Sequence, residues 1–287
     1  MDKAPTSITD LLTDSRPTIS FEFFPPKDAA GFDTLRTTFS ELQKFNPDFI
    51  SVTYGAMGSN QESSLAVVKE FASQIPTIAH LTCIGANTAS INSLLDSYSA
   101  FGVAGILALR GDIPKTYEGN PLGDFTSAND LITHIDGSNF EIGVSAFPEK
   151  HPESPSLAHD IEVLKLKQES GANFAMTQLF FEIDAYFELV AAARNAGITM
   201  PIVPGVMPIA NAKQVLRMAE MSGAKVPEQL LEELNSASDE EAARSIGMAF
   251  SAKLAKALVA GGAPGIHIFT LNHHRATAEL LVAAGLA

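Results

Sequence analysis

The chain of 287 residues has a single cysteine, Cys83, and no apolar run long enough to span a membrane. One cysteine cannot form a disulfide within the chain or build a cysteine-based zinc site. Positive charge is also scarce, since 19 Lys and Arg stand against 33 Asp and Glu and give a formal net charge of −14. This balance argues against nucleic acid or an anionic membrane as a partner, although a small anionic ligand needs only a few local donors.

Several catalytic motifs are absent as well. No Gly-x-Gly-x-x-Gly follows the first expected strand, and the sequence contains no phosphate-binding P-loop and no Gly-x-Ser-x-Gly elbow. His273 and His274 are adjacent, so their side chains diverge, and His267 and Cys83 have no ligand partners at useful spacing. We therefore expect no metal site. The polar N-terminus lacks an apolar targeting segment, which favours a cytoplasmic protein.

Strand-like and helix-like segments alternate along the chain at intervals of roughly 30 residues. Strands are expected at 18–24, 48–53, 78–83, 104–109, 141–146, 173–180, 202–206 and 265–271. The strands are apolar enough to be covered on both faces, as in a parallel sheet. Eight such units, preceded by a short helix after Ser7, predict a (β/α)8 barrel forming one domain over 1–287. A doubly wound sheet is the alternative, and the missing glycine motif argues against it.

The first expected strand carries a carboxylate within an aromatic run, SFEFFPP over 20–26. Alternation places Ser20 and Glu22 on one face and Phe21 and Phe23 on the other. Burying an ionised carboxylate in such a run costs free energy, so Glu22 should hold its proton or find a partner. A carboxyl group that stays protonated suits a general acid near neutral pH. A carboxylate that merely reaches solvent at the strand end is the alternative.

Other polar residues follow the expected strands at their C-terminal ends, where barrel enzymes place their active sites. Arg110, Gly111 and Asp112 form a compact donor and acceptor group directly after an apolar run. His80 lies between Ala79 and Leu81, where it is either a buried histidine bonded to a carbonyl or a catalytic base. The residues alone thus predict a barrel enzyme with one buried acid, one Asp/Arg group and no metal.

At these positions the sequence resembles the catalytic domain of methylenetetrahydrofolate reductases. The matching segments occur in order over nearly the whole chain: FEFFPP at 21–26, SVTYGA at 51–56, HLTCI at 80–84, ALRGD at 108–112, FPEKHPE at 147–153, GAN at 171–173, TQLFF at 177–181, PGVMP at 204–208 and FTLN at 269–272. The length is similar to that of the short bacterial form. The resemblance implies a (β/α)8 barrel that binds FAD and reduces 5,10-methylenetetrahydrofolate with NADH or NADPH.

The resemblance also implies roles for individual residues. Glu22 would be the general acid, Asp112 would lie near the flavin and the pterin, and Gln178 would contact nicotinamide or folate. FAD would be held by Thr53, His80, Arg110, Gly111, Asp112, Ala128, Phe147, His151, Asp160 and Lys167, and substrate would also meet Met218, Phe269 and His273. Arg110 and Lys167 would offset the charge of the diphosphate.

The sequence departs from the family pattern mostly at polar contacts to FAD. Phe147 stands where the family often has Tyr, and Ser127 replaces an aromatic residue. Val163 and Leu166 occupy helix positions that are commonly polar or basic, and Met218, Phe269 and His273 replace other side chains near the substrates. Two alternatives therefore stay open: folate reduction by direct hydride transfer without flavin, and a folate-binding subunit that needs a redox partner. A homo-oligomer is also compatible with the sequence.

Overall fold

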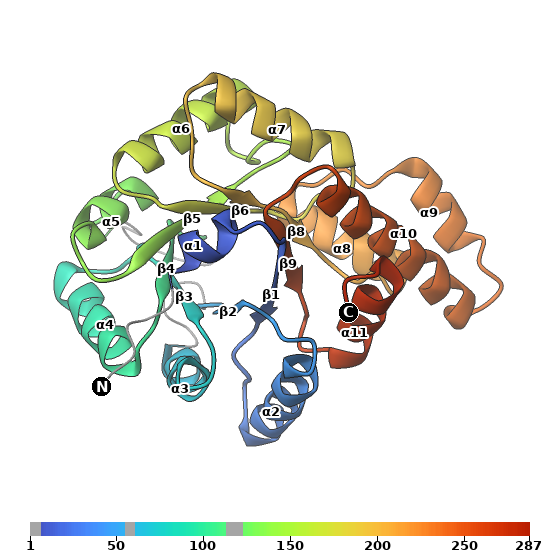
Figure 1. Ribbon diagram of the computed structural model, residues 1–287, viewed down its shortest axis with the longest axis horizontal. Helices are drawn as coiled ribbons and strands as arrows, with labels where there is room; N and C mark the ends of the chain where they lie inside the picture. Colours follow the sequence, from blue (N-terminus) through green and yellow to red (C-terminus); the bar gives the residue numbers. More distant parts are fainter. Residues whose placement is uncertain (1–6, 55–60, 113–122) are drawn as a thin grey trace.

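A computed structural model describes residues 7–54, 61–112 and 123–287 of the chain. Its strands form one sheet in the order β7-β6-β5-β4-β3-β2-β1-β9-β8, and every neighbouring pair is parallel. Figure 1 looks along the strands and shows the helices arranged around them. The predicted loop at 54–60 and the predicted excursion at 113–125 lie mostly outside the described residues.

The elements alternate as the sequence predicts. The strands are β1 (Thr18–Phe23), β2 (Phe49–Val52), β3 (Thr77–Thr82), β4 (Gly105–Leu109), β5 (Glu141–Ala146), β6 (Phe174–Thr177), β7 (Ile202–Val203), β8 (Gly205–Val206) and β9 (Gly265–Phe269). The helices are α1 (Ile8–Thr13), α2 (Ala29–Gln43), α3 (Gln61–Ala72), α4 (Thr88–Phe101), α5 (Ala128–Ile135), α6 (Leu157–Glu169), α7 (Ile183–Asn195), α8 (Ala212–Ser222), α9 (Glu228–Asn235), α10 (Glu240–Ala260) and α11 (His274–Ala284).

The segment 202–206, expected as one short strand, closes the barrel in two pieces. Ile202 and Val203 pair with β6, whereas Gly205 and Val206 pair with β9. Pro204 lies between the pieces and has no N–H to donate, but its carbonyl accepts a hydrogen bond of 3.0 Å from the His267 backbone N–H. Counted as one strand with a proline break, this segment completes the predicted (β/α)8 barrel.

The two faces of β1 are divided as the alternation predicts. Phe23 points outward and meets Phe39 of α2 and Phe71 of α3 edge-on, with ring centroids 5.9 Å and 5.8 Å apart. Ser20 and Glu22 point inward, toward residues of β9 and β3. The outward phenylalanines anchor β1 to the helical layer and thereby fix the direction of Glu22.

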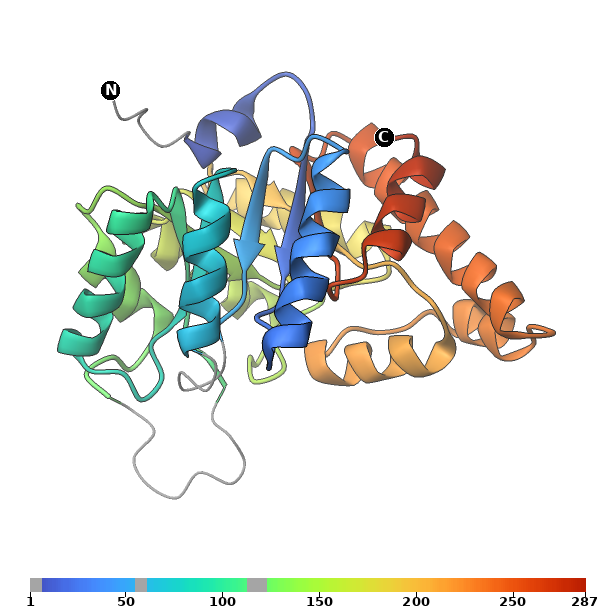
Figure 2. The ribbon, with the colours of Figure 1, turned by 90° about the horizontal axis from the view of Figure 1, so that it is seen from below.

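The amino-terminal end of the barrel is filled with apolar side chains. Ile8 and Leu12 of α1 are buried in a cluster with side chains from five strands: Phe49, Ile78, Leu107, Phe174, Met176 and Val203. Figure 2 shows α1 lying across the end of the barrel from which the strands begin. The Ser7 side chain caps α1 by accepting from the Asp10 N–H, as the spacing predicts. The extra N-terminal helix therefore plugs one end of the barrel.

Several boundaries differ from the expectation, most of them by one residue. The cap of α10 is Asp239 rather than Ser238, because the Asp239 carboxylate accepts from the Ala242 N–H at 2.8 Å. Strand β6 ends at Thr177 instead of 180, and β9 ends at Phe269 instead of 271. Leu271 and Asn272 have φ of +49° and +58°, which no strand allows. None of the helices in the described parts of the chain is long and apolar enough to cross a membrane.

Candidate active site

Glu22 lies near the carboxyl end of β1 and is 8% exposed. Its backbone carbonyl accepts a hydrogen bond of 2.6 Å from the Thr270 hydroxyl. The neighbouring Phe24 is bound through both its N–H and its carbonyl by the side-chain amide of Asn272, at 3.0 Å and 2.9 Å. The turn between β9 and α11 thus holds the backbone directly after the Glu22 side chain.

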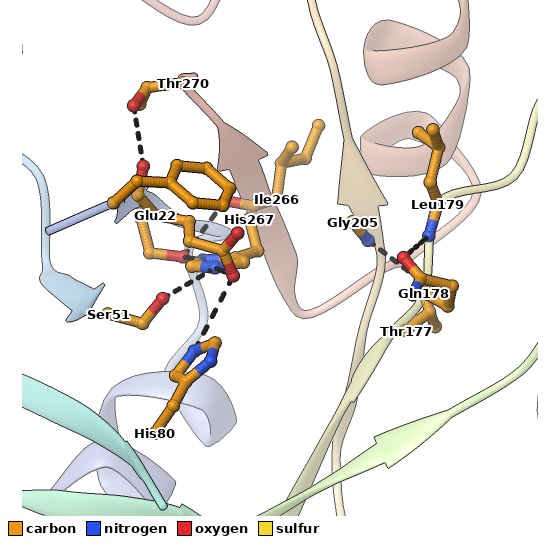
Figure 3. A network of polar contacts seen from close by, with 12 residues as sticks. Glu22, Ser51, His80, Thr177, Gln178, Leu179, Gly205, Ile266, His267 and Thr270 are labelled. Carbon is orange, nitrogen blue, oxygen red and sulfur yellow. Dashed lines mark hydrogen bonds and ion pairs between the residues drawn. The ribbon is translucent and has the colours of Figure 1, made fainter. Parts of the chain in front are cut away.

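Two imidazole rings converge on one oxygen of Glu22 (Figure 3). The Nε2 atom of His80 on β3 lies 3.6 Å from Glu22 Oε2, and Nε2 of His267 on β9 lies 3.8 Å from the same oxygen. Ser20 Oγ lies 2.8 Å from His267 Nδ1, and Ser51 Oγ lies 3.1 Å from its Nε2. The predicted acid therefore sits in a buried polar cluster, which the sequence indicated only through His80.

Burial lowers the pKa of His80 to about 4, although the negative charge of Glu22 opposes the shift. His80 is consequently neutral at physiological pH. Its Nε2 atom is buried and has no hydrogen-bond partner in the described structure. The Thr82 hydroxyl, two residues further along β3 on the same face, is also buried without a partner there. Such atoms are usually satisfied, so this edge of the barrel has donors and acceptors to offer a ligand.

The Arg110 group lies at the end of β4, beside β3. Gly111 has φ of +86°, and a Cβ there would come within 2.9 Å of Thr82 Cβ and 2.8 Å of Ile84 Cγ2, so only glycine fits. Asp112 is exposed and Thr53, after β2, is half-buried. Arg110 is paired with Glu153 at 2.7 Å, and this hydrogen bond raises the pKa of Arg110. The guanidinium is therefore engaged within the chain rather than free.

The other predicted FAD residues follow β4 and β5. Ala128 begins α5 and is buried, and Phe147 meets the His151 ring edge-on at 4.7 Å. The Asp160 carboxylate accepts from the His151 backbone N–H at 2.8 Å. Lys167 donates to the Ser145 carbonyl at 3.2 Å, and burial lowers its pKa to about 8. Leu166, at a position that the family commonly fills with a polar side chain, is 49% exposed.

The predicted substrate residues fall in separate places. Gln178 and Phe147 line one shallow hollow together, at the ends of β6 and β5. Phe269 pairs with Glu22 across β9 and β1, and its ring centroid lies 5.8 Å from that of His267. Met218 of α8 is half-buried against an apolar cluster of the last third. His273 is exposed in a hollow between α2 and the start of α11.

Sequence reasoning set aside His267, which the structure places next to Glu22. The pattern that drew attention to His80, a histidine between two apolar residues of a strand, also occurs at Ile266-His267-Ile268. The same criterion therefore selects both His80 and His267 as candidate site residues. Within residues 7–54, 61–112 and 123–287, no group of three or more His, Cys, Asp or Glu is placed to hold a metal ion.

The site residues on β3, β4 and α6 fit a flavin dinucleotide. The buried polar atoms of His80 and Thr82 that have no partner in the described structure suit the approach of a planar, hydrogen-bonding ring system. The Lys167 ammonium is a donor for a diphosphate, and Arg110 becomes a second one if it leaves Glu153.

Comparison with known proteins shows the family of the chain. The sequence profile of the family described as "Methylenetetrahydrofolate reductase" matches residues 7–285. The chain is 33% identical over 258 residues to the 5,10-methylenetetrahydrofolate reductase of Escherichia coli K12, covering 88% of this chain and 86% of the relative. It is 34% identical over 301 residues to methylenetetrahydrofolate reductase (NADH) 1 of Arabidopsis thaliana, covering 99% of this chain and 51% of the relative. The chain thus spans about half the length of its plant relatives.

Solved structures agree on the fold. A Clostridium thermocellum protein that binds two copies of 5-methyl-5,6,7,8-tetrahydrofolic acid has a TM-score of 0.65 at 14% identity, covering 96% of this chain and 97% of that one. The dihydropteroate synthase of Xanthomonas albilineans has a TM-score of 0.52 at 12% identity, covering 95% and 93%. The family profile and the bacterial relative extend over most of the sequence, and the profile match over residues 7–285 spans Glu22. The chain therefore belongs to the methylenetetrahydrofolate reductase family.

Proposed function

We propose that this protein reduces 5,10-methylenetetrahydrofolate to 5-methyltetrahydrofolate, with NADH or NADPH as the electron donor and FAD as the bound carrier. The observation that carries the proposal is the buried Glu22 at the carboxyl end of β1, in a chain of this family. Relatives bear names that specify NADH or NADPH, so the choice between the two donors is left to measurement.

Opening the five-membered ring of the substrate requires a proton on the departing ring nitrogen. Glu22 is the residue to supply it, because its side chain faces the barrel interior among polar side chains, and no lysine or arginine of the described residues forms an ion pair with it. The carboxyl ends of barrel strands are where substrates bind, and Glu22 and Phe269 pair directly at that end. Phe269 would form an apolar wall beside the pterin.

Bound FAD would supply the hydride chemistry, accepting two electrons from the nicotinamide and passing them to the opened folate. Thr53, His80, Gly111, Asp112 and Ala128 would line the ring end of this site. The diphosphate and adenosine end would meet Arg110, Phe147, His151, Asp160 and Lys167. Gln178 would contact whichever substrate is present, since it shares a hollow with Phe147.

The test is a visible absorption spectrum of the purified protein, followed by anaerobic addition of NADH and then of methylenetetrahydrofolate. A flavin band that bleaches with NADH and returns with the folate is the expected result. Protein that holds flavin but does not reoxidise with the folate contradicts the substrate assignment. If the protein is colourless, repeating the titration with added FAD separates loss of FAD during purification from a protein that does not bind it.

A second candidate is the same reduction by direct hydride transfer from the nicotinamide. The pairing of Arg110 with Glu153 and the exposed apolar Leu166 favour it, because both reduce the polar contacts available to FAD. Replacing Glu153 with Gln removes the carboxylate that competes for Arg110. If FAD is the cofactor, Glu153→Gln should bind FAD at least as tightly as the wild type. A colourless wild type that turns over without added FAD favours direct transfer.

A further inference from the structure

Lys150, in the loop after β5, has a backbone conformation that only glycine adopts freely. Its φ is +122°, whereas the other non-glycine residues with positive φ in the described chain, Asn46, Leu271 and Asn272, lie between +49° and +58°, close to the left-handed helical region. A side chain of this size at such a φ strains the backbone, so other contacts must hold Lys150 in place. Strain of this kind gathers where a loop must keep one particular shape.

The contacts that hold this loop come from the Lys150 side chain itself. Its Nζ atom donates to the carbonyls of His151, Pro152 and Ser154, at 3.1 Å, 3.4 Å and 2.6 Å. An ammonium group has three hydrogens, so these three carbonyls use all of them. The His151 carbonyl also accepts from the Ser154 backbone N–H at 2.9 Å, which closes a turn beside the ammonium. The half-buried Lys150 side chain therefore forms the centre of the loop over 150–154.

The turn that Lys150 holds also fixes the ring of His151. The Glu153 backbone N–H donates to His151 Nδ1 at 3.1 Å, and a backbone N–H can only donate. In the neutral ring the hydrogen is therefore on Nε2, which makes this atom a donor. The Phe147 ring meets the His151 ring edge-on, and the Asp160 carboxylate accepts from the His151 backbone N–H. The position of the ring and the identity of its donor atom thus depend on the conformation of the loop.

Contacts from outside the loop do not replace the ammonium. Arg110 pairs with the Glu153 carboxylate, but that side chain is 64% exposed, so water screens the attraction. The Pro152 and Ser154 carbonyls have no hydrogen-bond partner other than Lys150 within the described chain. Without the ammonium, nothing in that part of the chain would hold these two carbonyls together.

We propose that Lys150 is a positioning residue that keeps the loop over 150–154 in one conformation, so that His151 is ready to donate from Nε2 to a bound dinucleotide. The inference rests on the proposed function, in which His151 contacts FAD. The loop begins at the carboxyl end of β5, where barrel enzymes bind their ligands. With the three bonds formed in advance, the free energy of ordering the loop is not subtracted from the free energy of binding. The same bonds compensate the strain of the Lys150 backbone.

Four variants separate the ammonium from the strain and from the charge. Lys150→Met keeps the strain and loses the three bonds, Lys150→Gly loses both, and Lys150→Arg keeps a charged donor. Lys165→Met removes one positive charge from an exposed position of α6 and is the matched control. In thermal denaturation Lys150→Gly should have a higher Tm than Lys150→Met, because only glycine relieves the backbone. A Tm of Lys150→Gly at or below that of Lys150→Met overturns the assignment of strain.

Calorimetric titration with FAD measures the effect on binding. The affinity should fall about 10-fold in both Lys150→Met and Lys150→Gly, because the loop must then be ordered during binding. Lys150→Arg should lose less, and Lys165→Met should stay near the wild type. A merely structural residue would lower Tm and affinity together, whereas Lys150→Gly should recover Tm without recovering affinity. The proposal is overturned if Lys150→Met binds FAD as tightly as Lys165→Met.

Nuclear magnetic resonance of protein labelled with 15N-histidine tests the loop without any ligand. In the neutral ring of wild-type His151, the signals should report a bare Nδ1 and a protonated Nε2. In Lys150→Met the two nitrogen signals should move toward each other as the tautomers exchange, whereas Lys165→Met should match the wild type. Unchanged His151 signals in Lys150→Met overturn the proposal, even if the wild type binds FAD. If the wild type does not bind FAD, the proposed function fails, and these spectra still decide whether Lys150 orders the loop.

Discussion

The interior of the barrel has two halves that are formed by the same strands but differ in polarity. Toward the amino end, Phe49 of β2 and Ile78 of β3 pack with α1 in a fully apolar plug. Two residues further along, the same strands present Ser51 and His80 to Glu22. Because side chains alternate along a strand, positions two apart lie on the same face of the sheet. The apolar cluster and the polar site are therefore adjacent layers of the same barrel interior, only two residues apart along each strand.

The comparison explains how a buried acid is tolerated in this fold. The apolar half and the outward phenylalanines supply the contacts that keep the strands in place. The polar half can then hold groups such as His80 Nε2 and Thr82 Oγ1 without partners in the described structure. Changes in the plug should act on the free energy of unfolding, whereas changes near Glu22 should act on the reaction.

The largest expected effect is on the reaction. Replacing Glu22 with Gln keeps the shape but removes the proton, so folate reduction should fall by about 100-fold to 10,000-fold. Oxidation of NADH with an artificial electron acceptor should remain, because that step needs no acid at this position. Steady-state kinetics with both acceptors measures the split, and Glu62→Gln on the surface of α3 is the control. Normal folate reduction by Glu22→Gln would refute the acid assignment.

The plug should show the reverse pattern. Leu12→Ala removes a buried side chain from α1 and should lower the free energy of unfolding by about 2–5 kcal/mol, with kcat little changed. Urea denaturation and kinetics on the same preparation measure both quantities. Thr13→Ala changes an exposed residue of the same helix and serves as the control. A large loss of kcat in Leu12→Ala under conditions where the variant is fully folded would mean that the apolar and polar halves of the barrel are not independent.

The polar half should also reduce stability in acid. The pKa of His80 is 6.5 when the side chain is free and about 4 in the folded chain, so between these values the unfolded chain binds more protons. The free energy of unfolding should fall as the pH drops from about 6.5 to about 4, by about 3 kcal/mol from this group. Urea denaturation across this range should show a weaker dependence in His80→Gln. His159→Gln, at an exposed position on α6, should match the wild type.

A smaller effect is expected for Asn272, whose side chain joins the turn after β9 to the backbone after β1. Asn272→Ala loses both bonds to Phe24 and should lower the free energy of unfolding by about 2 kcal/mol. Asn272→Gly loses the same bonds but tolerates the φ of +58°, so it should be about 1 kcal/mol more stable than Asn272→Ala. Thermal denaturation of both variants separates the two contributions. Equal stability would show that the backbone conformation contributes nothing.

Local patterns predicted most of this fold. The spacing of apolar residues gave the order of strands and helices, and the alternation SFEF placed Glu22 inside and Phe23 outside. The cap of α1 at Ser7 was predicted from the acidic residue three positions later, Asp10. The cap of α10 was wrong by one residue, because Ser238 and Asp239 are both good caps and only the backbone path chooses between them.

The environment of Glu22 was harder to predict because its parts are distant in the sequence. Ser20 and His267 are separated by 247 positions, and only the pairing of β1 with β9 brings them together. The engagement of Arg110 by Glu153 likewise depends on how two loops fold back, 43 positions apart. The roles of the cofactor and substrate residues follow from the family resemblance and stay predictions.

The pairing of β1 with β9 has a consequence for synthesis on the ribosome. Glu22 emerges long before Thr270, which follows β9 and lies 248 positions further along the chain. Contacts between segments so far apart form late, since the intervening chain must first be ordered. An unfinished chain therefore carries its acid beside an open strand edge, without His267 or the Thr270 hydroxyl. The neighbours of the proposed acid are therefore complete only after β9 has joined β1 and the barrel has closed.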